Sequence, residues 1–190
     1  DEDAETYIVG NPPYLGRAKQ SREQKDDKAR LFDGIIQNYR SLDYVAGWVW
    51  LSAVYMESVA NAKAALVTTN SICQGQQVGI LWPPVLEKCE LIFAHQSFKW
   101  KNNAAAPAGV TVVVLGLGNG HSGDRLIFSE ANVLRAREIS PYILPGPLPI
   151  VTGRRRPISS VPAMDMGNMP LDGGGLIIDD PREVERYSQA

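Results

Sequence analysis

The sequence has few of the residues that build disulfide frameworks or metal sites. Among its 190 residues there are two cysteines, Cys73 and Cys89, and two histidines, His95 and His121. Both cysteines stand in apolar stretches, which predicts reduced core thiols in a cytosolic protein rather than a disulfide. The histidines stand apart, without companion ligands at metal-binding spacing, so a zinc site is not expected.

Long apolar runs, a secretory signal and a strong net charge are missing as well. No run approaches the ~18 apolar residues that a membrane span needs, and the first residues do not resemble a signal peptide. The formal net charge of −2 gives no global attraction to nucleic acid, so any face that binds nucleic acid must be local. With 44% hydrophobic and 21% charged residues, the composition is that of a globular chain. We therefore expect a cytoplasmic protein of one domain or slightly more.

The chain also has no initiating Met and no Gly-rich loop before its principal motif. That motif is Asn11-Pro12-Pro13-Tyr14, and it closely follows the acidic start of the chain at residues 1–5. We therefore expect the sequence to be a piece of a longer protein.

The principal motif follows a short apolar run. Residues 7–9 read as a buried strand, and Gly10 lets the backbone turn. The two prolines lock their own φ angles and remove two N–H donors, which makes the turn stiff. The side-chain oxygen of Asn11 and the carbonyl of Pro12 accept hydrogen bonds from an amino group, and Tyr14 stacks on a planar group. Ligands in open α/β sheets bind beyond the carboxyl ends of strands, so the motif predicts a cradle for a planar –NH2 group. A plain strand-to-turn connection is the alternative, because Asn-Pro is a common turn signal.

Strand and helix patterns alternate after the motif. Further strands are expected at residues 64–69, 91–95 and 110–115, and helices over 43–59 and 78–88. Asp43 is a candidate N-cap of the first helix, and Pro83-Pro84 should kink or restart the second. This alternation is typical of a parallel sheet with crossover helices. The third and fourth strands leave no room for a helix of usual length between them, so we expect them to be antiparallel neighbours.

A basic stretch follows the motif. Residues 17–30 carry six bases and three acids and almost no apolar side chain, which predicts a solvated, mobile loop or helix outside the core. A compatible hypothesis is that this stretch contacts phosphates beside the motif, with Arg17 and Lys19 as the first candidates.

Aromatic and basic residues alternate just after the third strand, at residues 97–103. Phe98 and Trp100 are candidates for stacking on bases, and Lys99, Lys101 and Asn102 for contacts with phosphates. An amphipathic hairpin edge would show the same alternation. Because the motif and this loop both leave strands at their carboxyl ends, we expect them to face each other across a cleft at one edge of the sheet.

Two further segments bear on the organisation of the chain. Gly118–Gly123 matches a dinucleotide-binding fingerprint, but residues 125–128 read as a strand where the fingerprint needs a helix, so a flexible turn is expected. From residue 129 onward prolines interrupt every long element, and Arg154, Arg155 and Arg156 form a basic cluster. We expect a boundary there, because the remaining residues are too few and too broken to bury a core alone.

Several of these segments resemble known enzymes. Asn11–Tyr14 resembles the motif of amino-methyltransferases. Phe98-Lys99-Trp100-x-Asn102-x-Ala104, followed by Ala108–Thr111, resembles the end of the catalytic domain in single-chain restriction–modification enzymes of type IIL. The segments Ser140–Tyr142, Arg154–Pro157 and Gly167–Gly174 resemble that family's passage into its target-recognition domain. In this family one polypeptide carries a nuclease, an adenine-N6 methyltransferase and the target-recognition domain.

The resemblance implies an α/β fold that is part of a Rossmann-like methyltransferase sheet, with parallel strands and a C-terminal antiparallel hairpin. Residues 1–128 would be the C-terminal, catalytic half of the methyltransferase domain, and residues 129–190 a linker and the beginning of the target-recognition domain. The family's Gly-rich loop and ribose-binding acidic residue precede the motif and are absent from this chain. Among residues present here, the resemblance leaves Asn11 to contact the cofactor, S-adenosylmethionine, and we expect the chain alone to be inactive.

The implied reaction is methylation of adenine N6 in double-stranded DNA after the base is flipped out of the helix. In that reaction Asn11 and the Pro12 carbonyl accept the two amino hydrogens, while Pro13 completes the motif. Tyr14 stacks on one face of the base, and Phe98, or Trp100 instead, on the other. The residues implied in DNA-backbone contact are Arg17, Lys19, Lys99, Lys101, Asn102, Arg154, Arg155 and Arg156. Two alternatives remain: an amino-methyltransferase acting on protein glutamine or RNA guanine, and a non-catalytic DNA-binding module that kept the fold.

Overall fold

Residues 5–100, 109–153 and 160 are described by the computed structural model. The chain divides into two compact units, Asp1–Gly153 and Arg154–Ala190, and the description here concerns the first. Its elements in chain order are β1 (Thr6–Gly10), η1 (Arg17–Lys19), α1 (Arg22–Phe32), η2 (Tyr39–Ser41), α2 (Ala46–Ser58), β2 (Ala62–Thr69), η3 (Asn70–Cys73), α3 (Gly75–Leu86), β3 (Glu90–Lys99), β4 (Thr111–Gly118), β5 (Arg125–Phe128) and β6 (Val133–Ala136). No helix in this described part is long and apolar enough to cross a membrane.

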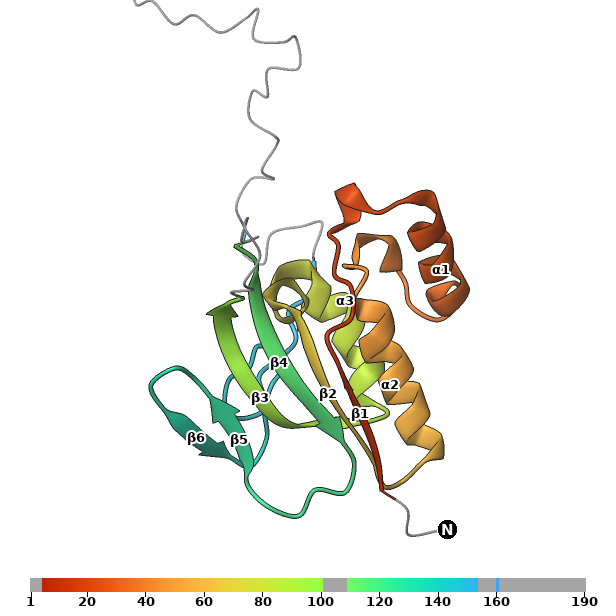
Figure 1. Ribbon diagram of the computed structural model, residues 1–190. Coiled ribbons are helices and arrows are strands. Elements are labelled where there is room, and N and C mark those ends of the chain that lie inside the picture. Colours follow the sequence, from red (N-terminus) through yellow and green to blue (C-terminus); the bar gives the residue numbers. More distant parts are fainter. Residues whose placement is uncertain (1–4, 101–108, 154–159, 161–190) are drawn as a thin grey trace, which may run out of the picture. The chain divides into compact units, whose positions relative to one another are not determined.

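The strands form one mixed sheet in the order β1-β2-β4-β3-β5-β6 (Figure 1). β1 pairs with β2 in parallel, and β3 pairs with β5 in parallel. β4 lies between β2 and β3 and is antiparallel to both, which confirms the expected antiparallel pair. The strands β1, β2, β3 and β5 therefore point the same way, and their carboxyl ends lie at one edge of the sheet.

The helices α2 and α3 cover the same face of this sheet (Figure 1). Alternate residues of β2 are buried beneath them, as expected for a strand with one face in the core. The buried cluster joins residues of α2 and α3 to the facing residues of β2, β3 and β4. α3 continues through Pro83 and Pro84 to Leu86, so the restart expected at these prolines does not occur.

β1 differs from its expectation. Tyr7 is 61% and Val9 78% exposed, and only Ile8 of the expected buried run packs against the core. Tyr7 and Val9 pair with Lys63 and Ala65 of β2, on the face that α2 and α3 do not cover. The prediction of a buried strand was therefore wrong, because in the described chain β1 pairs only with β2 at the edge of the sheet.

Three local predictions can be compared with the structure. Asp43 is not the N-cap of α2, because that position is Val45 and no side chain caps it. Gly118 ends β4, and the rest of Gly118–Gly123 lies in the connection to β5, as expected, with Gly120 at φ +66°. Cys73 and Cys89 are both free and buried. Burial raises the pKa of Cys89 to about 12 and that of Cys73 further still.

Candidate active site

The motif lies directly beyond the carboxyl end of β1. Asn11 and Pro13 are exposed, Pro12 is buried, and Tyr14 is half-buried and packs against the core. Gly10 has no positive φ, and a Cβ atom there would meet nothing within 4 Å, so this turn does not depend on glycine. The two prolines are enough to carry the chain out of the strand with the Asn11 amide facing solvent.

Buried polar groups hold the residue that follows Tyr14. The Leu15 N–H donates to Asp43 Oδ1 at 2.8 Å. The Leu15 carbonyl accepts from Gln20 Nε2 at 2.8 Å and from the Tyr44 N–H at 3.1 Å. The exit of the motif is thus fixed to the loop before α2.

Lys28 completes this network from α1, the helix formed by the basic stretch. Its ammonium donates to Gln20 Oε1 at 3.0 Å, to the Arg40 carbonyl at 3.3 Å and to the Leu42 carbonyl at 2.6 Å. Burial lowers the pKa of Lys28 to about 8, while the nearby Asp43 carboxylate opposes that change. The expectation that the basic stretch stays outside the core was wrong for Gln20 and Lys28, which are 5% and 2% exposed.

Only part of this arrangement had a signal in the sequence. Ser21 and Gln24 form a capping box that starts α1, and Ser-x-x-Gln is a recognised helix-start pattern. No local pattern marks Lys28 for burial, because its acceptors come from Gln20 and from carbonyls more distant in the chain.

The aromatic residues after the third strand form a row at the end of β3. The His95 and Phe98 rings are 4.9 Å apart, edge to face, and the Phe98 and Trp100 rings are 6.3 Å apart. A register shift between His95 and Phe98 places both rings opposite Val114 and Val112, on the sheet face away from the helices. Phe98 and Trp100 are half-buried, and Lys99 between them is exposed.

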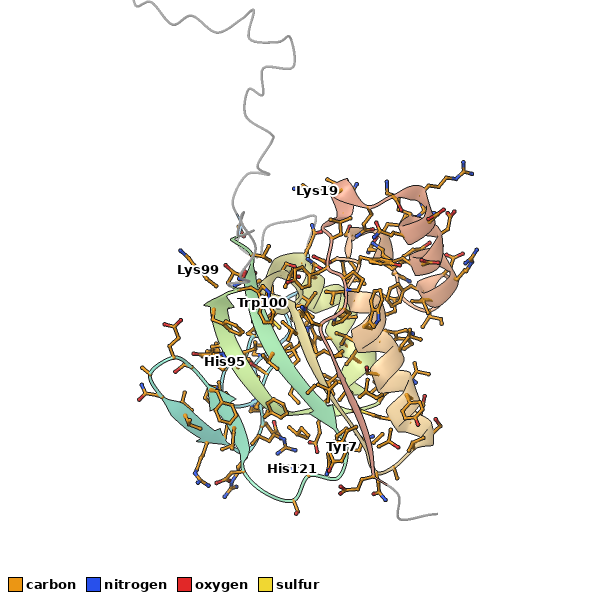
Figure 2. All side chains as sticks on the ribbon, viewed as in Figure 1. Tyr7, Lys19, His95, Lys99, Trp100 and His121 are labelled. Carbon is orange, nitrogen blue, oxygen red and sulfur yellow. The ribbon has the colours of Figure 1, made fainter. Side chains whose placement is uncertain are left out.

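Most of the candidate residues lie at the end of the sheet where β1, β2, β3 and β5 have their carboxyl ends. Lys19, Lys99 and Trp100 lie at the same end of the molecule, opposite Tyr7 and His121 (Figure 2). Arg17 and Lys19 are exposed in η1. β2 and β4 separate β1 from β3, so a cleft between the motif and Phe98 stays a prediction. Lys101, Asn102, Arg154, Arg155 and Arg156 lie outside the described residues.

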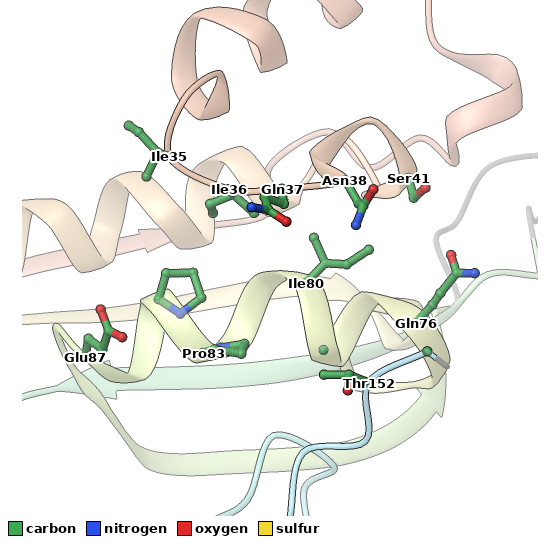
Figure 3. Close-up of a pocket in the computed structure, with 13 residues that line it drawn as sticks. Ile35, Ile36, Gln37, Asn38, Ser41, Gln76, Ile80, Pro83, Glu87 and Thr152 are labelled. Carbon is green, nitrogen blue, oxygen red and sulfur yellow. The ribbon is translucent and has the colours of Figure 1, made fainter. Parts of the chain in front are cut away.

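A hollow of about 650 Å³ between residues 35–41 and α3 contains none of the motif residues (Figure 3). Asn38, Gln76 and Ile80 are among the residues that line it. A smaller hollow of about 280 Å³ lies at the carboxyl edge, where Asn70, Gln96 and Ser97 contribute polar groups. We assign the chemistry to the motif and not to the 650 Å³ hollow. Asn38, Gln76 and Glu87 of that hollow could accept hydrogen bonds from an amine, but none of the described residues that line it has an aromatic side chain to stack on a planar base. Among the described residues no cluster of His, Cys, Asp and Glu fits a metal ion.

Comparisons with known proteins identify the family to which the chain belongs. The family model described as "MmeI, DNA-methyltransferase domain" matches residues 1–129. The chain belongs to this family. DNA methyltransferase A of Bacillus subtilis (strain 168) is 43% identical over 175 residues, which are 91% of this chain and 20% of that protein. The chain thus spans about a fifth of the length of this curated relative.

The structural comparison shows the fold. The solved structure of the type IIL restriction–modification enzyme MmeI in complex with DNA matches with a TM-score of 0.86 and 35% identity, over 97% of this chain and 25% of that one. The mixed sheet is therefore part of a Rossmann-like methyltransferase fold, as the resemblance implied.

Proposed function

We propose that this chain supplies the amino-group cradle of a DNA methyltransferase that acts on adenine N6. The observation that carries the proposal is the Asn11–Tyr14 motif at the carboxyl end of β1, with Asn11 exposed and Pro12 buried. Membership of a DNA-methyltransferase family supports a methyl-transfer reaction and a DNA substrate. A flipped nucleobase such as adenine offers a planar ring and an exocyclic –NH2 together, which suits an amide beside a tyrosine ring, and the resemblance to type IIL enzymes selects adenine among the bases with such a group.

The reaction follows from what the motif residues do to that amino group. Asn11 Oδ1 and the Pro12 carbonyl accept its two hydrogens, so the nitrogen becomes pyramidal and its lone pair turns toward the methyl donor. Tyr14 holds one face of the ring, and Phe98, or Trp100 in its place, holds the other. No strong base is needed, because the methylated ammonium loses its proton readily to water. Catalysis is then mainly positioning and preorganised hydrogen bonding.

S-adenosylmethionine, when bound, supplies an electrophilic methyl group at this edge of the sheet. Asn11 is the residue of this chain that we assign to its methyl end. We propose that a Gly-rich loop elsewhere in the same polypeptide holds the rest of the cofactor. Since the chain spans 20% of its curated relative, this division of the site between segments is consistent with the relative's greater length.

The same reasoning extends to the partners. We assign residues 1–128 to the catalytic half of a methyltransferase domain and residues 129–190 to a linker and the start of a target-recognition domain. The partners of the chain are then double-stranded DNA and the remaining methyltransferase and nuclease parts of a cytoplasmic restriction–modification enzyme. Exposed Tyr7 and Val9 on the edge strand β1 support a further protein segment on that side. We propose that the active site is complete only when this further segment is present, so we expect the chain by itself to be inactive.

The substitution Asn11→Ala in the intact protein tests the proposal. It removes one acceptor for the reacting amino group and should lower the methylation rate by ~10² or more. Duplex binding should stay within about threefold, because Asn11 contacts only the amino group. Asn119→Ala is the matched control: Asn119 is also exposed, follows β4 at the opposite edge of the sheet, and should leave both properties unchanged.

The product identifies the substrate. Mass spectrometry of digested DNA should show N6-methyladenine, and its replacement by another methylated nucleoside would contradict the adenine assignment. Retention of more than about a tenth of the wild-type rate in Asn11→Ala would contradict the role of Asn11.

A further inference from the structure

A single buried carboxylate connects the motif to three other parts of the fold. Asp43 is 4% exposed. Its Oδ1 accepts from the Leu15 N–H at 2.8 Å and from the Val45 N–H at 3.3 Å, just before α2. Its Oδ2 accepts from Thr69 Oγ1 at 3.1 Å, at the end of β2. Its own N–H donates to Gln77 Oε1 of α3 at 2.8 Å.

These contacts hold the C-terminal end of the motif, while β1 holds its N-terminal end. The turn is held at its start by the pairing of Gly10 with Leu66 of β2. It is held at its end by Leu15, whose N–H bonds to Asp43 and whose carbonyl bonds to Gln20 and Tyr44. Tyr14 lies next to that anchored residue, so a change at Asp43 reaches its ring through one peptide bond.

The surroundings of this carboxylate account for its burial and link it to the motif. A buried charge is costly unless hydrogen bonds satisfy it, and here three donors do so. Asp43 does not cap α2, which begins beyond it with Val45 at the N-cap position. Two of its contacts, to Leu15 and Thr69, lie at carboxyl ends of neighbouring parallel strands, where the reaction is proposed to occur.

We propose that Asp43 is a positioning residue for methyl transfer, which sets the orientation of Tyr14 and Asn11 by anchoring Leu15 to the end of β2. This inference rests on the proposed function, because it assigns Asp43 to the same reaction. Asp43 does not touch the base or the cofactor. It acts by geometry, and its hydrogen-bond acceptors matter more than its charge.

Two substitutions separate geometry from charge. Asp43→Ala removes both acceptors and frees the Leu15 N–H. Asp43→Asn keeps one side-chain oxygen to accept from Leu15, and its new amide hydrogens can reach Thr69 Oγ1, whose hydroxyl then turns toward Ser71 Oγ at 2.8 Å. The alanine variant should therefore lose the anchor, and the asparagine variant should keep it.

The test measures kcat and KM for DNA and for S-adenosylmethionine in the intact protein. For Asp43→Ala we expect kcat to fall about 10- to 100-fold with both KM values within about threefold, since small misplacements of reacting groups cost rates of this order. Asp43→Asn should retain at least about a third of the wild-type kcat. Val85→Ala is the control for general destabilisation: Val85 is fully buried in the last turn of α3, away from the motif edge. It should lower the melting temperature and leave kcat unchanged.

Three results would overturn the proposal: a kcat within threefold of wild type in Asp43→Ala, a loss in Asp43→Asn equal to that in Asp43→Ala, or an equal loss in Val85→Ala. The rate of hydrogen exchange of the Leu15 amide distinguishes a failure of the Asp43 proposal from a failure of the proposed function. Exchange that quickens in Asp43→Ala, together with full activity in Asn11→Ala, would show that the anchor is real and the assigned chemistry wrong. Loss of activity in Asn11→Ala, with unchanged exchange and kcat in Asp43→Ala, would reject the anchor alone.

Discussion

Lys28 should make the folded state more stable as the pH rises above about 8. Its side chain is 2% exposed, and its Nζ donates to Gln20 Oε1 and to the carbonyls of Arg40 and Leu42. Because burial disfavours the ammonium form, the pKa of Lys28 is lowered from 10.5 to about 8.

The sign follows from proton binding. Between pH 8 and 10.5 the unfolded chain keeps the Lys28 proton while the folded chain has lost it, so raising the pH favours the folded state. Below the pKa of Lys28 in the folded state, burial of the charged ammonium lowers the free energy of unfolding by its full amount. The interval between the two pKa values corresponds to about 3 kcal/mol, at roughly 1.4 kcal/mol for each pH unit. This cost should disappear as the pH rises through that interval.

Lys28→Met tests the magnitude, because methionine keeps the length of the side chain and cannot titrate. The free energy of unfolding would be measured by urea titration of the purified chain at about pH 7, 8.5 and 10, with circular dichroism as the signal. The wild-type value minus the variant value should increase by up to about 3 kcal/mol over this range, while other titrating groups cancel in the difference. Arg22→Met, which removes a positive charge at an exposed position on the same helix, is the control and should give a difference independent of pH. A pH-independent difference for Lys28→Met would refute the reasoning.

Three other predictions address the surface, the sheet and the cofactor. Removing the charge at Arg17, Lys19, Lys99 or Lys101 should weaken duplex binding equally on all sequences and reduce its salt slope by about one; an effect confined to the cognate site would contradict phosphate contact. Gly116→Ala should destabilise the fold by about 1–3 kcal/mol in thermal unfolding, because the new Cβ would lie 2.2 Å from the Phe93 ring; an unchanged melting temperature would contradict that packing. Calorimetric titration of the purified chain should detect no binding of S-adenosylmethionine, and micromolar affinity would show that this chain contains a complete cofactor site.

The sheet was largely predictable because its strands carry strong local signals. The β-branched run at residues 111–115 and the short connection before it were enough to predict an antiparallel partner for the third strand. The exposure of Tyr7 and Val9 was not predictable, since apolar residues at a strand edge look the same in sequence whether or not another segment covers them. The insertion of β4 between β2 and β3 is also a property of pairing and not of any one strand's composition.

The candidate site also contains residues that the sequence predicts and residues that it does not. Asn11–Tyr14 was found because its chemistry is contained in four consecutive residues. The sequence marks Asp43 only as a helix cap, because its partner Leu15 is 28 positions earlier in the chain. For Lys28 and Gln20 the sequence predicts solvent exposure. Polar side chains are buried only where tertiary partners satisfy them, and those partners have no local signature.

The position of the motif explains how an exposed amide can be held precisely. Pro12 and Pro13 remove two of the backbone rotations between Gly10 and Leu15. The pairing of Gly10 with Leu66 fixes one end of this segment, and three hydrogen bonds to Leu15 fix the other. Little packing around Asn11 is then required, which leaves its oxygen accessible to a substrate. The stiffness of the turn and the buried anchor beyond it are therefore complementary: a flexible turn would not transmit the anchor, and an unanchored turn would leave Tyr14 free to move.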